Sequence, residues 1–172
     1  VLYQLQNEGF HRRFLPIDPN SPEFFSPYLV QFTVAEYEAD FWTSVGYTNN
    51  WLDSTGPQTI AELLVDRLLL WQEPKGLQRN IRMKILAAQI TQTYGRTQVL
   101  EWFLNSQSYG HYSTGADTAA RVYFRKPASQ LTMGEAALLV SVSRTPALNP
   151  IDAPQAALEN QRIFLQKLVE EG

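Results

Sequence analysis

The stretch that most constrains the fold runs from Arg79 to Gly110, RNIRMKILAAQITQTYGRTQVLEWFLNSQSYG. Before Gly95, apolar residues leave almost no polar side, which predicts a buried helix. Gly95 predicts the end of that helix, and the residues after it predict a second one. Two adjoining helices of this kind indicate a domain that is mainly α-helical.

Two arginines interrupt the apolar pattern of the first of these helices. Residues three, four and seven apart share a helix face, so Arg79, Arg82 and Gln89 are expected on one stripe, with Met83 at its edge. Guanidiniums beside a buried helix need an anionic partner, because an unpaired buried charge is costly. The partner is either a carboxylate of the protein, which is the commoner case, or the phosphate of a substrate.

Composition excludes several classes of function. The 172 residues suffice for one domain with a substantial core. A net charge of −3 argues against a nucleic-acid partner, since such proteins carry an excess of basic residues. The chain has no cysteine, and its two histidines, His11 and His111, are too few for a zinc cluster. No metal site is therefore predicted from the side chains alone.

The chain is predicted to form one domain over residues 1–172, with a small β-hairpin at 1–17 and a helical body at 26–171. Alternating apolar residues on either side of a turn at 7–9 predict the hairpin. No run is long and apolar enough for a membrane-spanning helix, and no signal peptide is visible. The final helical pattern reaches the last residues, so we expect the chain to be a fragment of a longer protein.

Start and stop signals divide the helical body. Ser26 and Pro27 predict a helix start, and this helix is expected to stop near Gly46. Another helix is predicted from Thr59 onward. After the central pair, further helices are expected at 114–124, at 132–143 and in a last segment that ends at Glu171. Thr132-x-x-Glu135 is a capping box for one of them.

The segments VLEWFLNSQSYG and TGADTAARVYFRKPASQLTMGEAALLVSVSRTPALNP resemble signatures of glycosyltransferase family 51, the peptidoglycan glycosyltransferase domain of class A penicillin-binding proteins. The resemblance covers nearly the whole chain, and several blocks in the right order make a specific match. It implies a lysozyme-like helical fold on the extracytoplasmic face of a bacterial cell membrane. It also implies a membrane anchor outside this chain and a possible downstream transpeptidase domain.

The resemblance further implies a reaction. Such a domain polymerises lipid II onto a growing glycan strand, with inversion at the anomeric carbon and release of undecaprenyl pyrophosphate. A general base must take the proton of the acceptor hydroxyl, and cations or a divalent metal ion must stabilise the departing pyrophosphate. No nucleic acid takes part.

The resemblance places Tyr37 and Met83 where the family has its two glutamates. A tyrosine with a pKa of about 10 is ionised at roughly one part in a thousand at neutral pH, so it is a poor base. We therefore expect weak or lost activity. Glu38, at the next motif position, or Glu36 could serve as the base after a one-residue slip of the helix. Otherwise the two glutamates are a solvated pair and Tyr37 is a packing residue.

The substrate-binding candidates are Arg79, Arg82, Arg67, Thr59 and Asn105. For Arg67 the alternative is an ion pair with Glu62 or Asp66, and for Asn105 it is a hydrogen bond in the core near Glu101. Three functions compete: a weak lipid II glycosyltransferase, an inactive domain that binds the lipid precursor or acts as a scaffold, and a lysozyme-like hydrolase. The hydrolase needs an acid in an apolar pocket, and the sequence offers no clear one.

Overall fold

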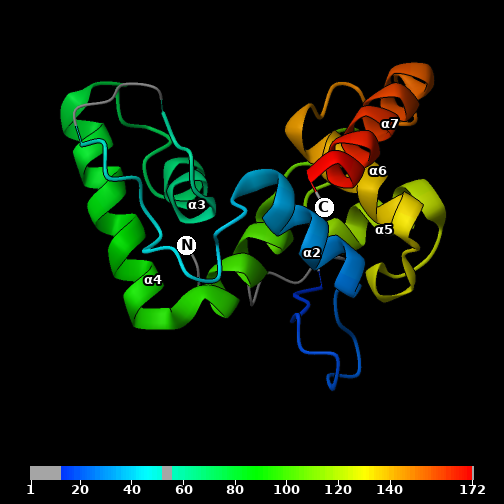
Figure 1. The fold of residues 1–172 in the computed structure, drawn as a ribbon, viewed down its shortest axis with the longest axis horizontal. Helices are drawn as coiled ribbons and strands as arrows, with labels where there is room; N and C mark the ends of the chain where they lie inside the picture. The colour runs from blue at the N-terminus through cyan, green and yellow to red at the C-terminus, as the bar shows by residue number, and fades with distance from the viewer. Residues whose placement is uncertain (1–12, 52–55, 172) are drawn as a thin grey trace. The chain divides into compact units, whose positions relative to one another are not determined.

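The computed structural model describes residues 13–51 and 56–171 (Figure 1). Its elements are α2 (Pro27–Tyr37), α3 (Ile60–Leu68), α4 (Leu77–Ser106), α5 (Ala116–Phe124), the 3₁₀ helix η1 (Ala128–Gln130), α6 (Met133–Arg144) and α7 (Pro154–Glu171). These residues form no strand, so the prediction of a mainly α-helical fold is confirmed. The predicted hairpin lies largely outside the described residues, and its described part, 13–17, contains no strand.

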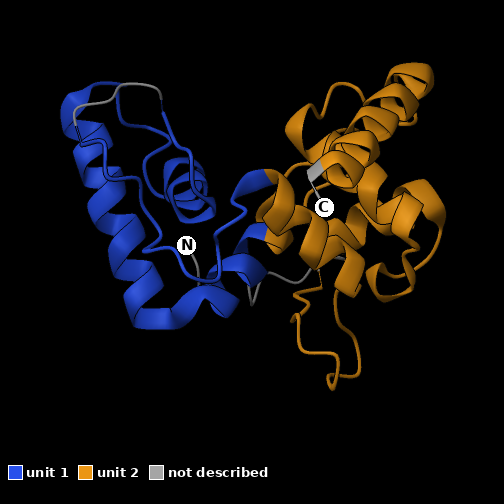
Figure 2. Cartoon of the chain, in the orientation of Figure 1, with its two compact units in different colours: residues 1–7, 37–103 blue, residues 8–36, 104–172 orange. Residues whose placement is uncertain are grey.

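The chain divides into two compact units, shown in two colours in Figure 2. Among the described residues, unit 1 comprises 37–103 and unit 2 comprises 13–36 and 104–171. Folding of residues 1–172 as one domain stays a prediction. No helix in 13–51 or 56–171 has both the length and the apolar character needed to cross a bilayer.

Unit 2 is built around α6. Eight consecutive residues of this helix, from Ala136 to Ser143, are buried, so neighbouring elements cover it on all sides. Helices α5 and α7 pack against it (Figure 1). The predicted capping box is confirmed: the Thr132 hydroxyl accepts from the Glu135 amide, and the Glu135 carboxylate accepts from the Thr132 amide at 2.8 Å. On α7, Phe164 contacts Phe32 of α2 edge to face, with ring centroids 5.7 Å apart.

Unit 1 contains α3 and the larger part of α4, which lie side by side in Figure 1. The first half of α4 buries one face only. The buried residues recur at helical spacing: Arg79, Asn80, Met83, Lys84, Ala87, Ile90 and Thr91. The prediction that this helix is buried all round is therefore wrong. Arg82, Ile85 and Gln89 are exposed, whereas Arg79 is buried, so the predicted stripe is split between the two sides.

Gly95 separates the two halves of α4, as predicted. Its φ of 79° and ψ of 163° are not helical, and they place it in a region of backbone conformation that is essentially restricted to glycine. The halves meet at a kink that requires a residue without a side chain. The second half then buries Val99, Leu100 and Phe103.

The prediction that the helix beginning at Pro27 continues to Gly46 is wrong, because α2 ends at Tyr37. The chain turns there: the Phe41 amide donates to the Glu38 carbonyl at 2.9 Å, and the Ser44 amide donates to the Asp40 carbonyl at 2.9 Å. Phe41 is buried by this turn. Burial of Phe41 and the polar contacts of Glu38 outweigh the local preference for helix.

Candidate functional site in unit 1

The first turn of α3 organises the polar residues of unit 1. Thr59 is the N-cap: its hydroxyl accepts from the Glu62 amide at 3.1 Å and donates to the Gly46 carbonyl at 2.8 Å. Glu62 completes a capping box by accepting from the Thr59 amide. The helix macrodipole favours carboxylates at this end. Two carboxylates, those of Glu38 and Glu62, occupy it.

Glu38 lies against the start of α3 and is only 8% exposed. One carboxylate oxygen, Oε2, accepts from the Ile60 amide at 2.8 Å, and the other accepts a short hydrogen bond from the Ser44 hydroxyl. Burial raises the pKa of the Glu38 carboxyl above its usual value of 4.5, while the bonds from Ser44 and Ile60 act in the opposite direction. The Glu38 carboxylate is thus fixed by two hydrogen bonds, and its pKa is raised toward neutral pH.

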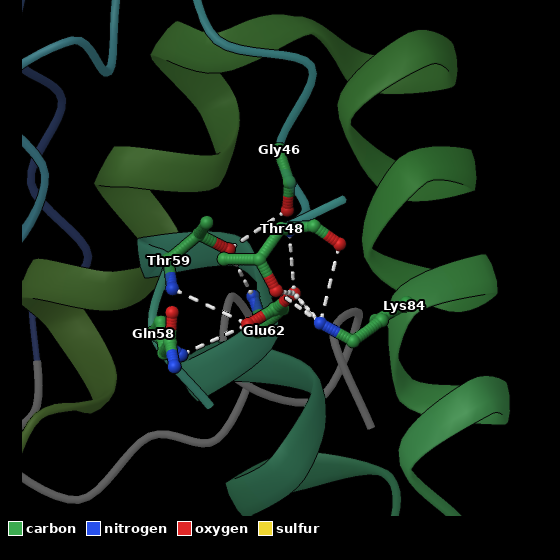
Figure 3. Close-up of polar contacts among 6 residues, drawn as sticks. All are labelled: Gly46, Thr48, Gln58, Thr59, Glu62 and Lys84. Carbon is green, nitrogen blue, oxygen red and sulfur yellow. Dashed lines mark hydrogen bonds and ion pairs between the residues drawn. The ribbon is translucent and has the colours of Figure 1, made fainter. Parts of the chain in front are cut away.

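Glu62, at the same end of α3, forms a buried ion pair with Lys84 of α4 (Figure 3). The Lys84 Nζ and Glu62 Oε1 are 3.2 Å apart, and the two side chains are 3% and 0% exposed. In Figure 3 the Glu62 carboxylate lies between the Lys84 ammonium and the backbone at Gln58 and Thr59. Sequence reasoning missed this pair. Thr59-x-x-Glu62 has the same capping-box pattern as Thr132-x-x-Glu135, so the sequence could have predicted the position of Glu62 at the start of a helix. No sequence signal predicts that Lys84 contacts it.

The two predicted arginines each face a carboxylate of the protein. Arg79 NH1 lies 2.5 Å from Asp66 Oδ1, and its Nε and NH2 donate to the Leu70 carbonyl at 3.3 and 3.1 Å. Arg82 NH1 lies 2.6 Å from Glu73 Oε1 on the exposed side of α4. Each arginine therefore has the internal partner that the sequence left as one of two possibilities.

Two hollows in unit 1 nevertheless expose cations. A hollow of about 350 Å³ is lined by Gly56, Pro57, Asp66, Lys75, Gly76, Arg79 and Asn80. A second, of about 510 Å³, is lined by Glu73, Pro74, Lys75, Gly76, Leu77, Gln78, Arg79 and Arg82. Lys75 and Arg79 line both, and no described acid lies within ion-pair distance of Lys75 Nζ. The lining of the second hollow thus carries three cations and one acid, and Asp66 pairs with Arg79, so three cations face two acids. The net positive charge suits an anionic group.

Glu36 belongs to unit 2. Its oxygens accept from Arg144 Nε at 3.0 Å and from Lys167 Nζ at 3.1 Å. These three side chains line a hollow of about 210 Å³ together with Ser141, Thr145, Asn160, Ile163 and Phe164. Glu36 and Glu38, the two candidate bases, therefore have different partners: two cations for one, and a hydroxyl and a backbone amide for the other.

The other residues singled out in the sequence are Asn105, Arg67, Tyr37 and Met83. The Asn105 amide group bonds both backbone groups of Leu15, accepting at 3.0 Å and donating at 2.9 Å. Arg67 is exposed on the last turn of α3. The Tyr37 ring packs edge to face on Phe103 with centroids 5.0 Å apart, and Met83 is 1% exposed.

The described side chains do not form a cage for a divalent cation. Within 13–51 and 56–171, no three His, Asp or Glu side chains converge as metal ligands do. The carboxylate oxygens of Glu38 and Glu62 are already taken by donors of the protein.

The chain is similar to known transglycosylases and penicillin-binding proteins. The family model described as "Transglycosylase" matches residues 35–169. Penicillin-binding protein 1A of Aquifex aeolicus is 36% identical over 118 residues, which cover 68% of this chain and 16% of the relative. The biosynthetic peptidoglycan transglycosylase of Mannheimia succiniciproducens is 25% identical over 156 residues, covering 84% of this chain and 64% of the relative.

The chain is also similar to a solved structure, penicillin-binding protein 1A of Haemophilus influenzae. The alignment has a TM-score of 0.41 and 21% sequence identity, and it covers 69% of this chain and 14% of that chain. The chain therefore spans only a small part of the penicillin-binding proteins it matches.

The raised pKa of Glu38 predicts a pH dependence of stability. The folded chain holds this proton more tightly than the unfolded chain, so folding binds protons between pH 4.5 and the raised pKa. Through that window the contribution of Glu38 to stability falls as pH rises. The free energy of unfolding of Glu38→Gln, minus that of the parent, should therefore increase with pH when both are unfolded in urea from about pH 4 to about pH 7. A difference that decreases with pH would contradict the burial argument.

Proposed function

This chain belongs to the transglycosylase family, and on that premise we propose that it is a peptidoglycan glycosyltransferase-type domain with weak activity. It transfers a lipid-linked disaccharide from lipid II to a growing glycan strand and releases undecaprenyl pyrophosphate. The match over residues 35–169 and the similarity to a biosynthetic peptidoglycan transglycosylase support the reaction class. The single observation that carries the role of this chain is the hollow at the start of α4, which three cations line.

The proposal includes a location and partners. The domain works on the extracytoplasmic face of a bacterial cell membrane, with lipid II and the glycan strand as its ligands. A membrane anchor and a transpeptidase domain are expected elsewhere in the full protein, since the similar penicillin-binding proteins are several times longer than this chain. Both are proposals about the whole protein.

The cations provide the substrate-binding half of the mechanism. The leaving pyrophosphate gains negative charge, so groups already oriented toward it lower the barrier. Lys75 and Arg82 present their charges at the hollow, while Arg79 is fixed at its rim by Asp66 and the Leu70 carbonyl. Arg67 is a further cation on α3. We assign Thr59 and Asn105 to ordering the backbone of Gly46 and Leu15, respectively.

Glu38 is the proposed general base. A base needs a pKa near the working pH, and burial shifts this carboxyl in that direction. Glu36 is less suited, because both of its carboxylate oxygens form ion pairs, one with Arg144 and one with Lys167. The activity is weak because Tyr37 and Met83 stand where the resemblance places glutamates.

The bonds of Glu38 also favour a second candidate function. Both of its oxygens already accept hydrogen bonds, as a carboxylate that only anchors the start of α3 would. In that case the domain has no turnover and instead binds the lipid precursor through the cationic hollow, or acts as a scaffold. The two candidates differ in the role of Glu38 and share the cations.

Turnover of labelled lipid II tests the first candidate. Glu38→Gln should lower the rate of polymerisation by about 10²–10⁴-fold, the usual effect of removing a general base. Glu36→Gln tests the alternative base, and Glu159→Gln, an exposed carboxylate on α7, is the matched control with an unchanged rate. Turnover that survives Glu38→Gln would eliminate Glu38 as the base. No turnover in the parent would leave the second candidate.

Binding of a pyrophosphate lipid tests what both candidates share. Lys75→Ala and Arg82→Ala should each weaken binding of undecaprenyl pyrophosphate by about tenfold, since each removes a charged contact. Titration calorimetry measures this, and Arg162→Ala, an exposed arginine on α7, controls for the loss of one positive charge. Equal affinity in all four proteins would rule out the cationic hollow as the binding site.

A further inference from the structure

We infer that the buried ion pair of Glu62 and Lys84 is a positioning device for Glu38. The inference rests on the proposed role of Glu38 and names two residues that act on it without touching substrate. The contacts that support it lie within unit 1, and Figure 3 shows some of them.

The pair joins three separate pieces of unit 1. Glu62 Oε1 accepts from the amide and hydroxyl of Thr48 at 2.8 and 3.1 Å, and Oε2 accepts from the Gln58 amide at 2.9 Å. From α4, Lys84 Nζ donates to the Thr48 carbonyl at 3.2 Å, to the Thr48 hydroxyl and to Glu62. The ion pair therefore ties the segment at Thr48 and the start of α3 to α4.

The start of α3 and the segment that ends at Thr48 also supply the two hydrogen-bond donors to Glu38. The start of α3 supplies the Ile60 amide at 2.8 Å, and the segment before Thr48 supplies the Ser44 hydroxyl. Between them, Gly46 accepts from the Thr59 hydroxyl at 2.8 Å and donates to Ser44 Oγ at 3.3 Å. A shift of Thr48 or of the α3 start thus moves the groups that fix the Glu38 carboxylate.

Gly46 lets this segment pack closely on α4. Its φ is +83°, and a Cβ placed there would lie 2.9 Å from Thr91 Cβ of α4, closer than real Cβ atoms approach. The segment is therefore packed directly against α4 at Gly46 and bonded to α4 at Thr48. A displacement of the ion pair is therefore expected to displace Ser44 and Ile60, which donate hydrogen bonds to Glu38.

Charge explains why both members are needed. Glu38, Asp40 and Glu62 are acids at this end of α3, and Lys84 is the cation that contacts Glu62. Loss of Lys84 would leave Glu62 buried without a counter-charge, which is far costlier than replacing both members. The Glu62 side chain would then move toward water, which loosens its bonds to Thr48 and Gln58.

Amide hydrogen exchange of the 172-residue chain tests the inference without any need for turnover. Ile60 is the first residue of α3, so its N–H has no partner within the helix, and its protection reports the bond to Glu38. Lys84→Met should speed exchange at Thr48, Gln58 and Ile60 at least tenfold relative to Leu100, a buried residue of the same unit. Adding Glu62→Gln to Lys84→Met should restore protection at Ile60, because the uncompensated charge is gone and an acceptor oxygen remains.

The chain offers a matched control in Lys126, which pairs at 2.5 Å with the capping-box glutamate of α6, Glu135, in a more exposed setting. Lys126→Met should change none of the three reporter amides. If Lys84→Met does not fold, Thr48→Val removes the bridging hydroxyl and keeps both charges, and should speed exchange at the same amides by about fivefold.

A second readout distinguishes positioning from general stability. In the parent, the Ile60 amide proton shift should follow the titration of the Glu38 carboxyl carbon; in Lys84→Met it should no longer do so. Faster exchange at Thr48 and Gln58 with Ile60 unchanged would show that the pair does not reach Glu38. An equal change at Leu100 would show a global loss of stability, and either result would overturn the inference. Failure of lipid II turnover would bear on the proposed function alone.

Discussion

The free backbone N–H groups at the start of α3 are the constraint around which unit 1 is arranged. A helix leaves its first amides without internal partners, and this one recruits two carboxylates, Glu38 for Ile60 and Glu62 for the residues just before it. Both acids are buried, so the arrangement depends on a buried cation, and Lys84 supplies it from α4. The turn after α2, the shape at Gly46 and the contact between α3 and α4 all follow from satisfying these groups.

The same rule of paired charges decides which cations are available for a substrate. Arg79 is buried, and its guanidinium is committed to Asp66 and to the Leu70 carbonyl. Lys75 and Arg82 lie at the surface of the hollow, where a phosphate can compete with water or with Glu73 at modest cost. The chemistry of unit 1 is therefore divided between a buried part that holds the carboxylate Glu38 and an exposed part suited to an anion.

Local signals in the sequence predicted local structure well. Gly95 marked the kink in α4, and Thr132 with Glu135 marked the start of α6, because both depend on a few neighbouring residues. The end of α2 was misplaced, since the turn at Glu38 is set by contacts with Ile60, 22 residues away. Periodicity also assigned Arg79 and Arg82 to one stripe, although one is buried and the other exposed. The Glu62–Lys84 pair joins two helices, and helix spacing says nothing about which side chains meet across them.

We propose that this domain catalyses the transglycosylase reaction slowly, because Tyr37 stands at the position of the family's glutamate base and Glu38 takes its role. The most direct measurement compares initial rates of lipid II polymerisation by this chain and by the biosynthetic peptidoglycan transglycosylase of Mannheimia succiniciproducens, to which it is 25% identical, under the same conditions. The account predicts a rate for this chain at least about a hundredfold lower, the scale of a compromised general base. Equal rates would contradict it.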